Sequence, residues 1–171
     1  MPTVIRLVIL GNSGSGKSTL ARHLSQHLGM ESTHLDELYW MPGGFECRRP
    51  QEEIAERLDV LSQSEGWVVE GVWGEMIAPL LPVATHFMFL DLPWTVCLQG
   101  LKERGPDPSV PHSHQRFYEL LSWAEAYFSR GGSCSRTCHL TLFNSFDGRK
   151  LRCEARLPVE QVLRWLVSGR A

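Results

Sequence analysis

Short apolar runs alternate with amphipathic segments along the chain. The runs at residues 4–10, 67–69 and 86–90 are mostly apolar and have the length of buried strands, and residues 33–36 form a shorter strand-like run that ends in an acid. Helix-like segments separate most of them, and this alternation predicts βαβ units around a parallel sheet. A fifth strand is predicted at residues 150–154, after the Asp147-Gly148 turn. The sequence therefore indicates an α/β fold.

Helical spacing of apolar residues marks the connecting segments. Residues 17–28 place their apolar side chains on one face, and Gly29 is a typical stop at the C-terminal end of a helix. Further helices are predicted at residues 51–62, from Pro93 to about residue 104, and behind Pro158. These helices would cover the two faces of the sheet.

The segment after residue 104 has a different character. Residues 105–113 carry three prolines and predict a loop. A helical stripe that we interpret as core packing follows it, made of Phe117, Leu120, Leu121, Ala124 and Phe128. Gly131-Gly132 then ends this helix.

Composition narrows the class of protein. The 171 residues favour a single domain, and the net charge of −2, with only Lys17, Lys102 and Lys150 as lysines, makes direct nucleic-acid binding an unlikely role. No apolar run is long enough for a membrane span, and the N-terminus does not resemble a signal peptide, so we expect a cytoplasmic protein. The five cysteines are irregularly spaced and indicate free thiols. Cys134, Cys138 and His139 lack a second ligand pair at the spacing of a zinc finger.

The strongest motif follows the first predicted strand. Gly11-x4-Gly16-Lys17-Ser18 matches the phosphate-binding loop (P-loop), and it lies between a strand and an amphipathic helix as that motif requires. Its backbone N–H groups and the helix N-terminus would cradle phosphates, Lys17 would contact the β- and γ-phosphates, and the Ser18 hydroxyl would bind Mg²⁺. The predicted nucleotide-binding residues are Gly11, Asn12, Ser13, Gly14, Ser15, Gly16, Lys17, Ser18 and Thr19. ATP or another nucleoside triphosphate and Mg²⁺ are the expected cofactors.

Carboxylates end the next three predicted strands. Asp36, Glu70 and Asp91 would meet at the carboxyl edge of the sheet, where ligands bind in open α/β folds. Acids there can ligate Mg²⁺ directly or through water, or take the proton of an attacking hydroxyl. The chain lacks an [NT]-K-x-D guanine-reading stretch and is too short for the accessory domains of motor ATPases. These features favour transfer of a phosphoryl group to an acceptor.

Three further stretches carry a family resemblance. "HLDELYWMPGGFECRRPQEE", "WVVEGVW" and "FLDLPWTVCLQGLKER" resemble the DNA topology modulation (FlaR-type) proteins, small P-loop kinases related to adenylate and shikimate kinases. The resemblance spans roughly residues 4–104 and returns weakly at 148–168. It implies a three-layer P-loop kinase fold with a five-stranded parallel sheet in the order 2-3-1-4-5. It also implies an acceptor-binding segment at about residues 37–66 and a lid at about residues 105–136.

The resemblance assigns acceptor roles to several residues. Asp36 corresponds to an acid beside the acceptor hydroxyl and is our candidate catalytic base, or else it caps the following helix. Tyr39 and Trp40, with Pro42 and Gly43, would shape the acceptor pocket, although Trp40 also suits plain packing. Arg48 and Arg49 lie where an acceptor phosphate or carboxylate would be clamped, or at least one of them is a solvated surface residue.

The resemblance also assigns donor-side roles. Arg104 begins the lid, where relatives place an arginine over the nucleotide, and it joins Lys17 and Asp36 as a candidate catalytic residue. Arg130 and Arg136 are weaker lid candidates, as is Arg116. Ser18, Glu70 and Asp91 are the candidate metal ligands, with helix capping as the alternative for Asp91. Gly105 and Gly131-Gly132 are candidate lid hinges.

The chain departs from the family pattern in three places. The usual Asp-Gly-Asn-Tyr is Glu70-Gly71-Val72-Trp73 here. Glu70 keeps the negative charge, and Val72-Trp73 makes the expected acceptor site more apolar than Asn-Tyr would. An arginine common in the helix after Leu-Asp-Leu-Pro is Gly100, and the lid holds fewer arginines than expected.

Our sequence-based hypothesis is an ATP–Mg²⁺-dependent kinase that acts on a small molecule as a monomer or homodimer. The alternatives are a non-catalytic or weakly hydrolytic nucleotide-binding regulator, and a nucleic-acid-associated regulator.

Overall fold

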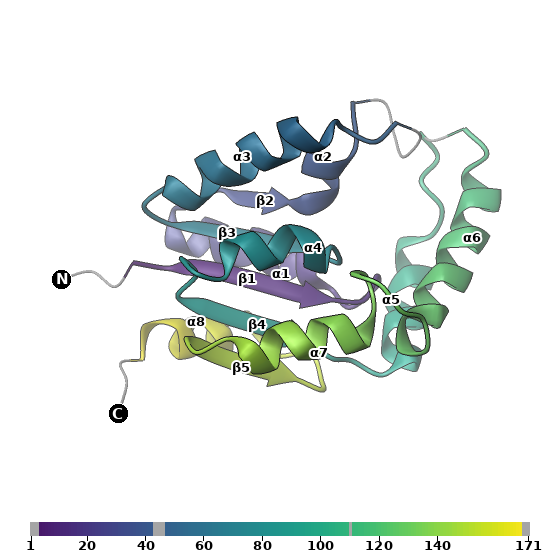
Figure 1. Cartoon of the computed structure of the whole chain (residues 1–171). Helices are drawn as coiled ribbons and strands as arrows, with labels where there is room; N and C mark the ends of the chain where they lie inside the picture. Colours follow the sequence, from purple (N-terminus) through teal and green to yellow (C-terminus); the bar gives the residue numbers. More distant parts are fainter. Residues whose placement is uncertain (1–3, 43–46, 110, 169–171) are drawn as a thin grey trace.

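A three-layer arrangement around one parallel sheet organises the chain (Figure 1). We describe a computed structural model, in which residues 4–42, 47–109 and 111–168 are placed. The elements in chain order are β1 (Arg6–Gly11), α1 (Lys17–Leu28), β2 (Ser32–His34), α2 (Leu35–Tyr39), α3 (Gln51–Gln63), β3 (Trp67–Gly71), α4 (Gly74–Ile77), the 3₁₀ turn η1 (Ala78–Leu80), β4 (His86–Leu90), α5 (Trp94–Arg104), α6 (Ser113–Glu125), the 3₁₀ turn η2 (Ala126–Phe128), α7 (Arg136–Ser145), β5 (Arg149–Cys153) and α8 (Val159–Val167).

The sheet has the order β2-β3-β1-β4-β5, and every pair is parallel. This confirms the predicted fold class and strand order. The central strand β1 is buried on both faces because side chains alternate along a strand: Val8 and Leu10 face one side, whereas Leu7 and Ile9 face the other. Crossover connections of this kind bring the carboxyl ends of all five strands to one edge.

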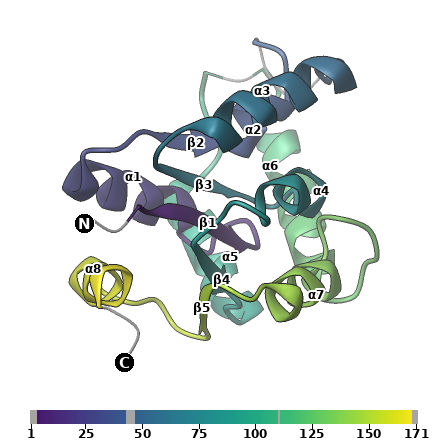
Figure 2. The ribbon, with the colours of Figure 1, turned by 60° about the vertical axis from the view of Figure 1, so that its left-hand side comes forward.

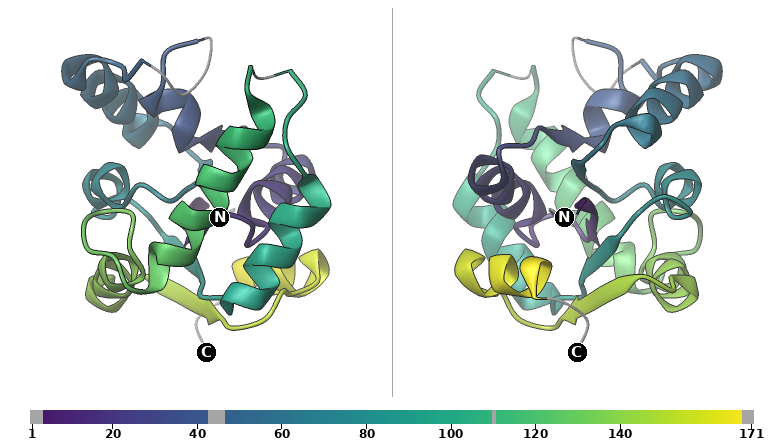
Figure 3. Two further views of the ribbon diagram at one scale, coloured as in Figure 1. Left: turned by 90° about the vertical axis from the view of Figure 1, so that its right-hand side faces the viewer. Right: turned by 90° about the vertical axis from the view of Figure 1, so that its left-hand side faces the viewer.

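Two helical layers bury the two faces of the sheet. One core contains apolar residues of α3, α4 and α7, and the second contains those of α1, α5 and α8 (Figure 2). The helix α6 belongs to neither layer. It stands with α5 in front of the carboxyl ends of the strands when that edge faces the viewer (Figure 3, left). The sheet thus leaves its ligand-binding edge facing the predicted lid.

The predicted boundaries differ from the structure at informative places. The helix at 17–28 and the strand at 86–90 are confirmed. The predicted strand at 33–36 is wrong in its second half, because the helix α2 begins at Leu35 and places Asp36 in a first helical turn. Helix α7 lies in a stretch for which we predicted no element, because its many small polar residues give a weak helical pattern. Gly43, predicted to shape the acceptor pocket, lies outside the described residues.

Candidate active site

The P-loop joins β1 to α1 by a backbone that only glycine adopts easily. Gly14 and Gly16 have φ values of 79° and 91°, in the left-handed region. A Cβ on Gly14 would also collide with the carbonyl oxygen of Cys97 in α5. The loop therefore packs directly against α5. Helix α1 begins at the end of this loop, at the edge of the sheet where phosphates would bind.

Lys17 lies folded back along this loop. Its Nζ donates to the carbonyl oxygen of Asn12 at 3.1 Å, and the residue is only 7% exposed. Burial lowers the pKa of Lys17 below its ordinary value, although the nearby carboxylates of Glu70 and Asp36 partly offset this effect. The lysine therefore lies between the loop and two acids, as a phosphate-binding cation requires.

Glu70 and His34 form a close pair at the ends of β3 and β2. Glu70 Oε1 lies 3.0 Å from His34 Nδ1. Burial opposes the charge on each group, but the pairing outweighs it, so the pKa of Glu70 is lowered and that of His34 is raised. Both carboxylate oxygens of Glu70 are buried without a hydrogen bond of good geometry. A buried carboxylate in this position fits a cation such as Mg²⁺, and the exposed Ser18 is close enough to lower the pKa of Glu70.

Asp36 is held by an aromatic cluster. Trp73 Nε1 donates to Asp36 Oδ1 at 2.6 Å, while Asp36 Oδ2 lies 3.5 Å from His34 Nε2. The Trp73 ring stacks on Tyr39 with centroids 3.8 Å apart, and Trp40 packs edge-on against Tyr39. The Val72-Trp73 departure thus replaces a polar pair with an indole that orients the candidate base. Tyr39 is thereby linked to Asp36 through Trp73, and the predicted role of Tyr39 and Trp40 in the acceptor pocket stays a prediction.

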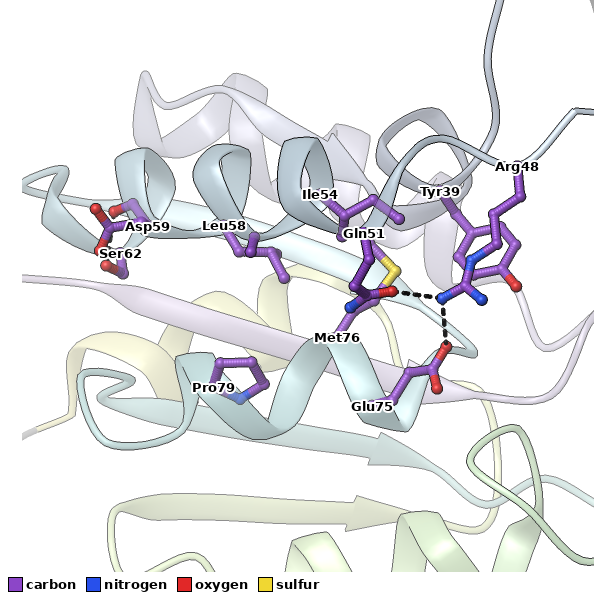
Figure 4. A pocket seen from close by; sticks show the side chains of 11 residues that line it. Tyr39, Arg48, Gln51, Ile54, Leu58, Asp59, Ser62, Glu75, Met76 and Pro79 are labelled. Carbon is purple, nitrogen blue, oxygen red and sulfur yellow. Dashed lines mark hydrogen bonds and ion pairs between the residues drawn. The ribbon is translucent and has the colours of Figure 1, made fainter.

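A cavity of about 320 Å³ lies next to this cluster, between α3 and α4. Figure 4 shows Tyr39 and Arg48 at one end and Asp59 at the other. The Arg48 guanidinium lies over the Tyr39 ring, 4.8 Å from its centroid, and Nη2 donates to Gln51 Oε1 at 2.6 Å. Arg48 therefore faces the candidate acceptor pocket.

Arg49 has a different place, and the structure revises its predicted role. The residue is 6% exposed, and its guanidinium donates to the carbonyl oxygens of Leu38 and Trp40 and pairs with Glu53. These bonds fix the connection between α2 and α3. With its donors bound inside the protein, Arg49 is a structural residue here and not an acceptor clamp.

Asp91 is likewise engaged by neighbouring side chains. Its buried carboxylate accepts from Arg136 at 2.7 and 2.8 Å and from Arg152 at 2.6 and 3.0 Å. Burial opposes the charge, but the two arginines hold the pKa of Asp91 below its ordinary value. These four bonds engage both oxygens of Asp91 with arginines, which compete with a metal ion for the carboxylate, and they tie Arg136 to the end of β4. The structure therefore revises both predictions, of Asp91 as a metal ligand and of Arg136 as a free lid arginine.

Two further lid arginines differ in availability. Arg130 lies flat on the Trp123 ring, 3.6 Å from its centroid, and donates to the carbonyl oxygens of Trp123 and Cys134, so it stabilises the base of the lid. Arg104, exposed at the end of α5, makes no hydrogen bond or ion pair among the described residues, and its charge helps to lower the pKa of Lys17. Arg104 is the predicted lid arginine that stays available to a nucleotide.

Two contacts of the P-loop were not predicted from the sequence: the bond from Asn12, itself a predicted nucleotide-binding residue, to α6, and the approach of Arg156. Asn12 is buried, and its Nδ2 donates to the carbonyl oxygen of Ala124 near the end of α6 at 2.8 Å. Arg156 follows β5, and its Nη2 donates to the carbonyl oxygen of Gly14 at 3.2 Å. The only signal in the sequence for Arg156 was the unusual Gly100, because a Cβ at position 100 would lie 2.5 Å from Arg156 Nη2.

Known proteins share this fold. No family model matches the chain. YqaC of Bacillus subtilis (strain 168), an uncharacterized protein, is 28% identical over 179 residues, which cover 94% of this chain and 97% of YqaC. A gluconokinase from Sinorhizobium meliloti 1021 has a TM-score of 0.57 at 17% identity, covering 96% of this chain and 90% of its own. Shikimate kinase from Aquifex aeolicus vf5 has a TM-score of 0.51 at 20% identity, covering 94% and 92%.

These likenesses show that the chain has the fold of small P-loop kinases. They do not confirm the FlaR-type family name. Within the part of the chain that the structure describes, no helix combines the length and apolar character needed to cross a bilayer. The roles of the site residues stay predictions.

Proposed function

We propose that the chain is a kinase that transfers the γ-phosphoryl group of ATP, or of another nucleoside triphosphate, to a hydroxyl of a small molecule. The resemblance of its motifs to FlaR-type proteins agrees with this proposal. One observation carries it: Glu70 of β3 and Asp36 in the first turn of α2 converge on His34, at 3.0 and 3.5 Å, and both act on the pKa of Lys17. A protein that only held a nucleotide would not need Asp36 oriented beside the phosphate site.

In the proposed reaction, the P-loop amides and Lys17 bind the β- and γ-phosphates. The acceptor oxygen forms a bond to the γ-phosphorus as the bond to the β–γ bridging oxygen breaks, and the acceptor proton passes to Asp36. Trp73 donates to Oδ1 of Asp36, so Oδ2, which lies 3.5 Å from His34 Nε2, is the oxygen that would take the acceptor proton. Lys17 and Arg104 offset the charge that develops on the phosphoryl oxygens.

Magnesium enters this scheme through Ser18 and Glu70. Mg²⁺ supplies charge neutralisation and alignment of the β- and γ-phosphates when it is bound. The buried carboxylate of Glu70 and the exposed hydroxyl of Ser18 are the groups that would hold it, directly or through water.

A purified-protein assay tests the proposal. ADP release should depend on an added acceptor and should be lost in Asp36→Asn, while ATP binding is retained. The alternative, a nucleotide-binding regulator, is favoured by the internal bonds of Arg130 and Arg136. ATP binding without turnover on any hydroxyl compound would support the regulator and contradict the kinase.

A further inference from the structure

The cavity between α3 and α4 has the size and lining of a small-molecule pocket. Its volume of about 320 Å³ lies at the lower end of the range for ligand sites. Ile54 and Leu58 of α3 form one wall, and Met76 and Pro79 form the facing wall (Figure 4). These apolar walls can enclose a flat or apolar group and remove it from water.

The cavity is joined to the candidate catalytic base by a stacked aromatic pair. Tyr39 lines the cavity, and its ring lies within 13° of parallel to the ring of Trp73. Trp73 in turn donates to Asp36. A molecule that reaches from the cavity past Tyr39 would bring its hydroxyl toward Asp36.

The polar groups at the Tyr39 end of the cavity balance one another in charge. Arg48 binds Gln51 and lies 4.0 Å from the Glu75 carboxylate. Asp59 adds a second acid at the far end. Among the cavity-lining residues that the structure describes, Arg48 is the only cation, and it is already paired. Proteins normally bind a phosphate or carboxylate group through unpaired arginines. Because Arg48 is already paired, binding such a group in the cavity would be unfavourable.

We propose that the acceptor is a neutral alcohol with a flat heterocyclic ring, of the nucleoside kind, and that the ring occupies this cavity. This inference rests on the proposed function for the fate of the hydroxyl, but the binding of the ring does not. Arg48 and the Gln51 amide provide N–H donors, and Glu75 and the Gln51 oxygen provide acceptors. Such a set matches the edge of a heterocycle, which carries donors and acceptors side by side.

Binding and turnover are measured separately to test this inference. Quenching of tryptophan fluorescence would follow the addition of nucleosides, and of the matching nucleoside 5′-monophosphates, with a non-hydrolysable ATP analogue present. ADP release would be followed on the same compounds and on hydroxylated ring carboxylates. We expect at least one nucleoside to bind and to be phosphorylated, and its monophosphate to bind roughly tenfold more weakly or not at all.

Substitutions of cavity residues test whether the ring of the nucleoside binds there. Glu75→Gln and Arg48→Gln should raise the KM for the nucleoside about tenfold, with the KM for ATP unchanged. Arg57→Ala is the matched control, because Arg57 lies on α3, which forms one wall of the cavity, but pairs with Glu53 and does not line the cavity. Circular dichroism would establish that all three variants are folded.

The binding and turnover results together support or overturn the proposal that the acceptor is a nucleoside. Nucleoside binding that depends on Glu75 and Arg48 supports it even if no phosphoryl group is transferred, and in that case the proposed function alone fails. Turnover of monophosphates or ring carboxylates in place of neutral nucleosides would overturn the inference and leave the proposed kinase function standing. Failure of every nucleoside to bind would also overturn it.

Discussion

The guanidinium of Arg156 reaches across from the loop after β5 and donates to the carbonyl oxygen of Gly14 at 3.2 Å. The space that it occupies is open because residue 100 is a glycine, and a side chain there would meet both Arg156 and the Gly14 carbonyl. Arg156 thus supplies a cation beside the P-loop where the family resemblance implies one from position 100.

The Arg156–Gly14 contact predicts a donor-side phenotype. Arg156→Ala should raise the KM for ATP roughly tenfold through loss of one charge-assisted contact, with the KM for the acceptor unchanged. Steady-state kinetics with each substrate varied in turn would measure the two constants. Arg164→Ala, another charged residue of the C-terminal region, is the control. An unchanged KM for ATP in Arg156→Ala would contradict this role.

Asn12 connects the P-loop to the lid helix. Its buried side chain donates to Ala124 and accepts from the Ser13 N–H at 2.8 Å. Asn12→Ala would remove one of the two donors to the Ala124 carbonyl oxygen, which keeps the Ala126 N–H, and would take the acceptor from the Ser13 N–H. We therefore expect about 1 kcal/mol lower free energy of unfolding. Hydrogen exchange should also become faster in α6 and stay unchanged in β3. Faster exchange spread evenly over the chain would show that Asn12 does not couple loop and lid specifically.

The ion pairs of Asp91 with Arg136 and Arg152 should contribute to the stability of the fold and not to metal binding. Asp91→Asn removes the charge that two arginines share, and we expect a loss of about 2 kcal/mol in the free energy of unfolding, because the arginines are only partly buried. Urea unfolding measures this loss. The Mg²⁺ dependence of activity should be unchanged. A shifted Mg²⁺ requirement would return Asp91 to the metal site.

A buried histidine gives the fold a predictable dependence on pH. His139 Nδ1 contacts the Tyr127 hydroxyl and Nε2 contacts the Val72 carbonyl oxygen, each at 2.8 Å. Burial lowers the pKa of His139 to about 4. The unfolded chain takes up this proton near pH 6.5 but the folded chain does not, so stability is complete above pH 6.5 and falls as the pH drops toward 4.

Two measurements check this pH dependence. Urea unfolding at pH 8, 6 and 5 should show a decreasing free energy of unfolding, by up to about 1.4 kcal/mol per pH unit for one histidine. The His139 ring signals in NMR spectra should stay those of a neutral imidazole down to about pH 5. A ring titration with a midpoint at its ordinary pKa would refute the account.

The parts of the site that are local in sequence could be predicted from it. The P-loop could be recognised from the sequence because a buried strand, spaced glycines and an amphipathic helix follow one another within residues 6–28. The convergence of Glu70 and Asp36 near Lys17 followed from the parallel sheet, which brings strand ends together.

The parts that depend on distant partners could not be predicted. Asp91 meets Arg136 and Arg152 across 45 and 61 residues of chain, and Gly14 meets Arg156 across 142. The identity of an arginine or aspartate does not reveal its partner, and no local pattern distinguishes an ion-paired Asp91 from a metal ligand. The same reason explains Arg49, whose burial depends on how α2 and α3 pack.

The central claim is that a phosphoryl group leaves the P-loop for an acceptor, and acceptor-dependent ADP release in wild type and Lys17→Ala tests it most directly. Our account predicts ADP release that rises with acceptor concentration in the wild-type protein and falls at least a hundredfold in Lys17→Ala, through loss of one preorganised charge at the transferring group. Release that does not depend on any acceptor, or that persists in Lys17→Ala, would contradict it.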